Sequence, residues 1–170
     1  MKKIICTLLV SLVFISSFIS CKHATLPQDI TCETILNKAL SVGMNDDFDS
    51  EYLKSQDNFN SVLLSLWADG MFAESKDIEY ISDYAIRIGS AGNTFEIAIL
   101  KARDMESVDK VYSIIERRKQ TISGGDNSLY DPNFSIRFDN MIIKSEGLFV
   151  IMLMTEDNES RLNKIDELKS

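Results

Sequence analysis

The middle of the chain alternates between hydrophobic and polar positions, a pattern typical of a β-strand with one buried face. Residues 80–89 and 94–102 show it and are separated by the turn sequence SAGN, so they predict a β-hairpin. Residues 140–144 and 148–155 are separated by the turn sequence SEG and predict a second hairpin. The segments 94–102 and 148–155 are apolar at nearly every position, which indicates strands buried on both faces. We therefore place these two strands in the middle of the sheet.

Four other segments carry apolar residues at the spacing of an α-helix. They are residues 30–42, residues 60–67, residues 105–122 and a last helix that Asp157 or Asn158 can cap. The long helix stands between the two hairpins, so it must cross over the sheet. The pattern predicts an α+β fold: a four-stranded antiparallel sheet in the order 1-2-4-3, two hairpins joined by a long crossover helix, and additional N- and C-terminal helices. The long helix covers one face, and the N-terminal helices or a partner cover part of the other.

The N-terminus reads as a targeting segment. Lys2 and Lys3 precede the uncharged residues 4–19, which reach roughly 24 Å as a helix and are short for a bilayer core of about 30 Å. The tetrad FISC, ending at Cys21, resembles a bacterial lipobox, in which the cysteine is lipidated. We predict a signal peptide over residues 1–20, a lipidated cysteine with a short tether over 21–28, and one α+β domain over 29–170. An uncleaved N-terminal anchor, or cleavage that leaves a free Cys21, is the alternative.

The three cysteines agree with a lipid anchor. Cys6 leaves with the signal peptide and Cys21 takes the lipid, so Cys32 has no partner for an intramolecular disulfide. We interpret Cys32, within the first predicted helix, as a small buried core residue. Trp67 is interpreted as a core residue in the same way.

The charge balance restricts the partners. Removal of Lys2 and Lys3 lowers the 18 basic residues to 16 against 26 acidic residues, a formal net charge of −10. Nucleic acids and anionic lipids require a basic surface, so neither is expected as a partner. Contact with the membrane is expected through the lipid on Cys21. The charged run ERRK, residues 116–119, is interpreted as a solvated end of the long helix.

The sequence carries no recognisable catalytic or metal-binding motif. Its one histidine, His23, follows the lipidated cysteine and cannot join a catalytic triad or a zinc site in the domain. The acidic pairs Glu74/Asp77 and Glu156/Asp157 are expected in so acidic a chain, and the acidic segment 45–52 lacks the spacing of a calcium-binding EF-hand and is read as a loop. We predict no catalytic residue, no metal and no cofactor.

From about residue 31 to residue 168 the chain resembles a family of bacterial lipoproteins that is catalogued only as a domain of unknown function. The likeness lies in the segments SDYAIRIGSAGNTFEIAILKARD (82–104), VDKVYSIIERRKQ (108–120), LYDPN (129–133) and NMIIKSEGLFVIML (140–153). The resemblance implies an extracytoplasmic, lipid-anchored α/β domain on a cell membrane, inner or outer if the cell has two. It implies no activity and no functional residue besides Cys21.

These observations favour a binding or interaction module of the cell envelope, with an envelope protein as a possible partner. The alternatives are a small-ligand-binding accessory lipoprotein of a transport system and an enzyme. A pocket with a few convergent polar groups would favour a small ligand, and a flat apolar patch would favour a protein.

One possible binding surface is the sheet itself, where the strands 94–102 and 148–154 and the residues Met141, Met152 and Met154 form an adaptable apolar face. If the first two helices cover that face, a partner must meet the loops instead. These loops are Ser90–Asn93, Gly124–Asn133 and Asn45–Glu51.

Overall fold

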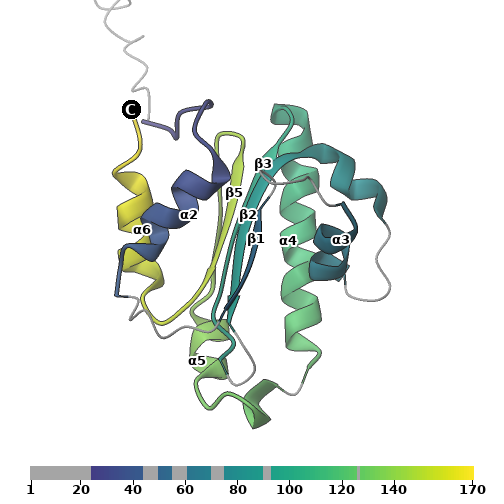
Figure 1. Ribbon diagram of the computed structural model, residues 1–170, viewed down its shortest axis with the longest axis vertical. Helices are drawn as coiled ribbons and strands as arrows, with labels where there is room; N and C mark the ends of the chain where they lie inside the picture. Colours follow the sequence, from purple (N-terminus) through teal and green to yellow (C-terminus); the bar gives the residue numbers. More distant parts are fainter. Residues whose placement is uncertain (1–23, 44–49, 55–60, 70–74, 90–92, 126) are drawn as a thin grey trace, which may run out of the picture.

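The computed structural model describes residues 24–43, 50–54, 61–69, 75–89, 93–125 and 127–170. Within these ranges the protein is an α+β fold with one antiparallel sheet between two layers of helices. Figure 1 shows the sheet nearly edge-on, with α2 (Cys32–Leu40) and α6 (Asn158–Asp166) on one face. The helices α3 (Ser61–Asp69) and α4 (Val108–Ser123) lie on the other face. The predicted fold class is confirmed.

The sheet contains the two predicted hairpins. They are β2 (Ile81–Gly89) with β3 (Glu96–Ala102), and β4 (Ile142–Glu146) with β5 (Phe149–Met154). These four strands lie in the order β2-β3-β5-β4, which confirms the predicted order 1-2-4-3. Strands β3 and β5 pair with each other in the interior of the sheet, as their continuous apolar sequences predict.

A fifth strand, β1 (Ser50–Lys54), extends the sheet beyond the predicted four. It pairs antiparallel with β2, from Ser50 opposite Gly89 to Lys54 opposite Ala85. The sequence assigned residues 45–52 to an acidic loop; residues 44–49 lie outside the described ranges, but Ser50, Glu51 and Tyr52 belong to this strand. The strand was missed because its sequence, SEYLK, is too short and polar to show an alternating pattern.

The helices begin and end close to their predicted positions, with two differences. Helix α4 begins at Val108, because residues 105–107 form a 3-10 turn in which the Asp104 carboxylate accepts a 2.8 Å hydrogen bond from the Ser107 amide. The short helix α5 (Phe134–Asp139) occupies a segment for which the pattern predicted no element. It lies at the end of the sheet near the start of β3 and the end of β5 (Figure 1).

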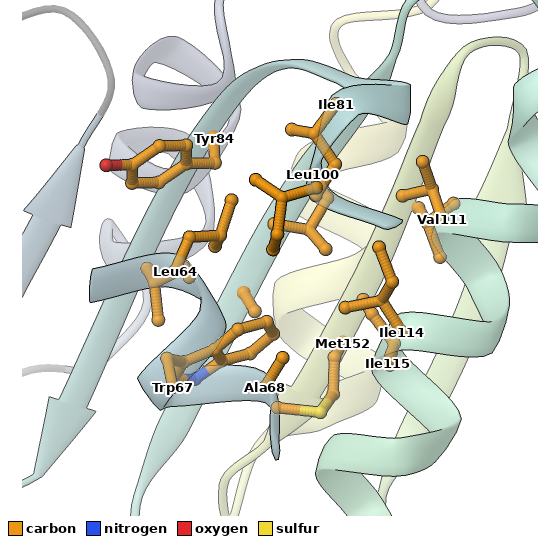
Figure 2. Packing of buried hydrophobic residues seen from close by; sticks show 14 of the residues in the cluster. Leu64, Trp67, Ala68, Ile81, Tyr84, Leu100, Val111, Ile114, Ile115 and Met152 are labelled. Carbon is orange, nitrogen blue, oxygen red and sulfur yellow. The ribbon is translucent and has the colours of Figure 1, made fainter. Parts of the chain in front are cut away.

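The larger part of the core fills the space between the sheet and the pair α3 and α4. Figure 2 shows Leu64 and Trp67 of α3 on one side of this cluster and Ile114 and Ile115 of α4 on the other, with Met152 of β5 between Trp67 and the α4 residues in this view. All five side chains are buried, so the prediction that Trp67 belongs to the core is confirmed.

The second part of the core lies between the sheet and the pair α2 and α6. Each element contributes fully buried side chains, for example Ile35 of α2, Phe149 of β5 and Ile165 of α6. Cys32 also lies here with no exposed surface, which confirms its predicted place in the core. Burial, and next the negative charge of Asp83, raise the pKa of the Cys32 thiol well above its ordinary value, so this sulfur is held in the neutral form.

Coverage of both sheet faces corrects one hypothesis from the sequence. Met152 and Met154 are buried and Met141 is partly buried, so these residues of the sheet do not offer the open apolar face that the sequence suggested. The cover also differs from the expected one. The first two helices lie on opposite faces, and the C-terminal helix α6, with α2, covers the face that α4 leaves free. A binding site must therefore be sought at the ends of the strands.

A candidate ligand pocket at one end of the sheet

A pocket of about 430 Å³ opens where β2 ends and β3 begins, and we call it the sheet-end pocket. Its volume lies within the range of small-molecule sites, about 300–1,000 Å³. Strands β2, β3 and β5, helix α4 and the segment after α4 all contribute to it. Its lining residues are Ile88, Gly89, Asn93, Thr94, Glu96, Arg118, Ile122, Asn127, Tyr130 and Met154.

One side of the pocket is formed by a buried ion pair between Glu96 and Arg118. The Arg118 guanidinium donates from Nη2 to Glu96 Oε2 at 2.7 Å and from Nε to Glu96 Oε1 at 3.0 Å, a two-point contact. The Glu96 side chain is 2% exposed and the Arg118 side chain is 17% exposed. Two charges removed from water to this degree require close pairing, since desolvation costs each of them several kcal/mol.

The Trp67 indole completes this group, which we call the Trp67–Glu96–Arg118 network. Its Nε1–H donates to Glu96 Oε1 at 2.7 Å, and the Trp67 carbonyl accepts a 3.0 Å hydrogen bond from Arg118 Nη1. The guanidinium also lies over the indole ring, 5.7 Å from its centroid. The network therefore ties α3, α4 and β3 together beside the pocket.

The local sequence explains why these side chains meet. Glu96 is the first residue of β3 and shares a face with Ala98 and Leu100, which point toward α4. Arg118 follows Ile114 and Ile115 by one turn, so it lies on the buried face of α4. Both charged residues therefore lie on faces that point toward the core, at the end of the sheet.

A second polar network borders the pocket through Thr94, and Asp131 is its centre. The buried Asp131 carboxylate accepts hydrogen bonds from the Thr94 amide at 2.7 Å, the Thr94 hydroxyl at 2.6 Å and the Asn133 amide at 2.9 Å. It also pairs with Arg137 of α5, whose other guanidinium nitrogen reaches Glu156 at 2.9 Å. Burial alone would raise the Asp131 pKa, but the hydrogen bonds from Thr94 and Asn133, with the charge of Arg137, outweigh it and lower that pKa.

This arrangement predicts an acid-dependent contribution of Asp131 to stability. A carboxylate with a lowered pKa stabilises the folded state above its unfolded pKa of about 3.9, and this stabilisation is lost as the pH falls through the folded pKa. The Asp131→Asn variant should therefore unfold at a lower temperature than the wild type at pH 7, and the difference should shrink below about pH 4. Thermal unfolding followed by circular dichroism between pH 7 and pH 2.5 measures this.

The control for Asp131 is Asp139→Asn, at the exposed end of α5. This change should leave the unfolding temperature nearly unchanged at every pH, because surface substitutions usually alter stability by less than about 0.5 kcal/mol. A constant difference between wild type and Asp131→Asn down to pH 2.5 would contradict the prediction.

The rim of the pocket combines exposed side chains with a tight backbone turn. Leu129 and Tyr130 are each 74% exposed, and Tyr130 lines the pocket. At Gly89 the backbone runs very close to the segment that precedes β3, and a Cβ atom there would stand 2.1 Å from the Asn93 carbonyl oxygen. Only glycine fits at this position, so the mouth of the pocket on the β2 side is shaped by the backbone.

The sequence located part of this site. The loop Gly124–Asn133, predicted as a fallback contact region, supplies Asn127, Tyr130 and Asp131. The loop Ser90–Asn93 contributes Asn93, while its other residues and most of the loop Asn45–Glu51 lie outside the described ranges.

The ion pair at the pocket was missed, and one interpretation of the charged run was wrong. Residues 116–119 were read as a solvated helix end, but Arg118 turns inward and is mostly buried. Two sequence features could have revealed this ion pair. They are a lone glutamate, Glu96, within the apolar run FEIAIL, and an arginine on the apolar face of a helix.

Of the other residues considered in the sequence, Glu156 and Asp157 line two smaller cavities of about 260 and 210 Å³. Cys21, His23 and Glu74 lie outside the described ranges. Glu156 contacts Arg137 and Asn133. Among the described residues, no group of three or more His, Cys, Asp and Glu side chains is placed to hold a metal ion. In the same part of the chain, no helix has the length and apolar character needed to span a bilayer.

Comparisons with models of protein families, with curated proteins and with solved structures found no match to this chain. The likeness to a family of lipoproteins therefore stays a prediction from the sequence. The function must be argued from the geometry of the pocket and from the N-terminal segment.

Proposed function

We propose that this protein is a lipid-anchored binding module of a bacterial cell envelope that holds a small ligand in the sheet-end pocket. The observation that carries the proposal is the pocket itself: a cavity of about 430 Å³ with apolar walls and a few polar groups from several elements. Such a combination is typical of small-molecule sites. It favours a small ligand over a protein partner, for which a flat apolar patch was the expected sign.

Binding without catalysis agrees with the chemistry of the side chains at the pocket. A catalytic acid or base must be free to exchange a proton with the substrate. Glu96 instead accepts three hydrogen bonds, from the Trp67 indole and twice from Arg118. Asp131 is held in the same way by Thr94, Asn133 and Arg137. These carboxylates keep the pocket in shape, and the proposal assigns them no proton transfer.

The position of the pocket relative to the proposed anchor supports a ligand from outside the membrane. The tether leads into the domain at the far end of the sheet, where Lys101 Nζ donates to the Gln28 carbonyl at 2.5 Å and the Ser170 amide donates to the Thr25 carbonyl at 3.4 Å. The pocket lies at the opposite end, near Glu96. Strand β3 alone, with seven residues, separates the two ends by roughly 20 Å. Figure 1 shows α5 and the C-terminus at opposite ends of the sheet.

A lipid on Cys21 would hold the domain by its tether end, with the pocket pointing away from the bilayer. An envelope protein that meets the same end would contact the exposed side chains of Leu129 and Tyr130. An accessory role beside a transporter also agrees with this orientation, since the pocket would then face the solute or the protein that delivers it.

Loss of the anchor is the expected result of Cys21→Ala. Without the sulfur no diacylglycerol can be attached, and the two or more acyl chains that stable anchoring requires are lost. The variant should leave the membrane fraction or remain as an uncleaved precursor, and it should not incorporate labelled palmitate. Fractionation of cells, the mass of the protein and labelling with palmitate measure the three effects.

The matched control is Cys32→Ala, which removes the buried thiol of the domain and should keep both the label and the membrane location. Palmitate labelling and membrane association that persist in Cys21→Ala would contradict the anchor. The binding half of the proposal is independent of this result.

A further inference from the structure

We infer that the sheet-end pocket takes an uncharged, largely apolar small molecule whose carbonyl oxygen accepts hydrogen bonds from Arg118. The inference rests on the proposed binding function and specifies the chemistry of its ligand. Three features of the pocket carry it: the pairing of its charges, the unused donors of Arg118, and the apolar character of its walls.

The charges at the pocket already neutralise each other. Glu96 and Arg118 form a two-point pair on its lining, and the neighbouring Asp131 is paired with Arg137. A ligand carboxylate would compete with Glu96 for the guanidinium, and a ligand ammonium would compete with Arg118 for the carboxylate. Because Glu96 and Arg118 already neutralise each other, either ion would bring an additional charge of one sign into a buried site, which is unfavourable. A neutral ligand leaves both pairs intact.

The hydrogen-bonding capacity of Arg118 is only partly used. A guanidinium carries five N–H donors and no acceptor. Among the described residues, three of these donors have partners: two bonds go to Glu96 and one to the Trp67 carbonyl. Two N–H groups remain on a side chain that lines the pocket and is only 17% exposed. A ligand that displaces water from them must supply an acceptor, since a buried donor without an acceptor is destabilising.

The walls around this donor are suited to an apolar body. Ile88 of β2, Ile122 of α4 and Met154 of β5 face the cavity, and Tyr130 stands at its rim. Methionine and tyrosine adapt well to apolar and aromatic groups, because the thioether is flexible and the phenol ring is large and rigid. A carbonyl next to a hydrocarbon or aromatic group therefore matches the pocket in both polarity and size.

Trp67 gives a specific probe of binding in the full chain. It is the one tryptophan of the protein, so its indole N–H yields a single resonance in a sample labelled with ¹⁵N-tryptophan. That N–H bonds Glu96, which lines the pocket and pairs with Arg118. A ligand that bonds Arg118 should shift this resonance in a saturable manner.

The experiment compares three probes of the same shape and different charge at pH 7. They are 4-phenylbutanamide, which is neutral, 4-phenylbutanoate, which is an anion, and 4-phenylbutylamine, which is a cation. We expect the amide to bind at least about tenfold more tightly than either ion, because only the amide leaves the Glu96–Arg118 pair intact. The full chain is used in detergent micelles, and the same detergent serves for every variant.

Two variants with matched size changes locate the binding. Ile88→Phe fills the pocket and should weaken binding of the amide by at least about tenfold. Leu148→Phe makes a similar change in a partly buried residue of the same cluster that does not line the pocket, and it should leave the affinity within about twofold. Partition of the probe into micelles affects both variants equally, so the difference between them reports on the pocket.

A third variant tests the donor. Arg118→Lys keeps a positive charge for Glu96 but loses the planar, two-sided guanidinium. It should reduce the preference for the amide over the anion, which a purely structural role of Arg118 would not alter. Its fold is checked by circular dichroism, and the Ile88→Phe result stands without it.

The outcomes distinguish the inferred ligand class from the proposed binding function. Tightest binding of the amide, with loss in Ile88→Phe and not in Leu148→Phe, supports the inferred ligand. Equal or tighter binding of the anion or the cation at the pocket overturns the ligand class and leaves the proposed binding function in place. Failure of all three probes to shift the Trp67 resonance overturns both.

Discussion

Replacement of Glu96 by leucine should lower the free energy of unfolding by about 3–5 kcal/mol. This is the cost usually found when one partner of a buried ion pair is removed and the other charge is left without compensation. In Glu96→Leu the Arg118 guanidinium loses its carboxylate and the Trp67 indole N–H loses its acceptor. Urea denaturation followed by circular dichroism measures the change, with a constant slope indicating that the variant still unfolds in one step.

The control for this prediction is the double variant Glu96→Leu with Arg118→Met. It replaces both charges by apolar side chains, so no unpaired charge remains, and such replacements are often neutral or stabilising. The double variant should be more stable than Glu96→Leu alone. If it is less stable by the sum of the two single changes, the two residues act independently and the ion pair is not the cause of the loss.

Replacement of Phe149 by alanine should lower the free energy of unfolding by about 3–5 kcal/mol, the usual cost of truncating a fully buried aromatic residue. Phe149 begins β5 in the interior of the sheet and packs on the α2 and α6 side, with no exposed surface. The Lys101 ammonium lies 5.2 Å from its ring centroid, an interaction that is lost as well. The midpoint of urea denaturation should fall accordingly.

The matched control for Phe149 is Tyr130→Ala, which removes an aromatic ring that is 74% exposed at the pocket rim. This variant should remain within about 0.5 kcal/mol of the wild type. Similar losses in both variants would show that aromatic content, not burial against α2 and α6, explains the effect. Tyr130→Ala also tests the rim of the pocket without altering the stability of the fold.

The strand order could be predicted because it depends on local patterns that determine burial. The segments of β3 and β5 are apolar on both faces, and such strands belong in the interior of a sheet. The turns after β2 and β4 are short enough to form hairpins, and the long helix between the hairpins then has one sensible path across the sheet. The strand order and the coverage of one face of the sheet by the long helix α4 followed from these features.

Elements with weak local patterns could not be predicted. Strand β1 has five residues with no clear alternation, and its place is decided by the free edge of β2 with which it pairs. Helix α5 is a six-residue segment, too short to be stable alone. It is held in place by contacts that only the fold provides, among them the pairing of Arg137 with Asp131.

The candidate site also depends on contacts that local sequence patterns do not predict. Glu96 and Arg118 stand 22 residues apart and on different elements. Neither residue belongs to a motif, and each looks unremarkable in the sequence except for its apolar surroundings. What makes them a site is that the start of β3 and the last turns of α4 meet beside the segment after α4. The loop Gly124–Asn133 was expected to be available to a partner, but its share in a pocket depends on this meeting.

The sequence by itself determined the features that depend on neighbouring residues: the two hairpins, the strand order, the amphipathic helices and the buried Cys32. The lipid attachment at Cys21 stays a prediction from the sequence. Only the tertiary structure decided which helices cover which face of the sheet, where β1 and α5 lie, and that a buried ion pair borders a pocket at the end away from the tether. The physical reason is the separation along the chain over which each effect acts. Periodicity and turns act within a few residues along the chain, whereas packing, desolvation and ion pairing depend on groups that meet only after the chain has folded.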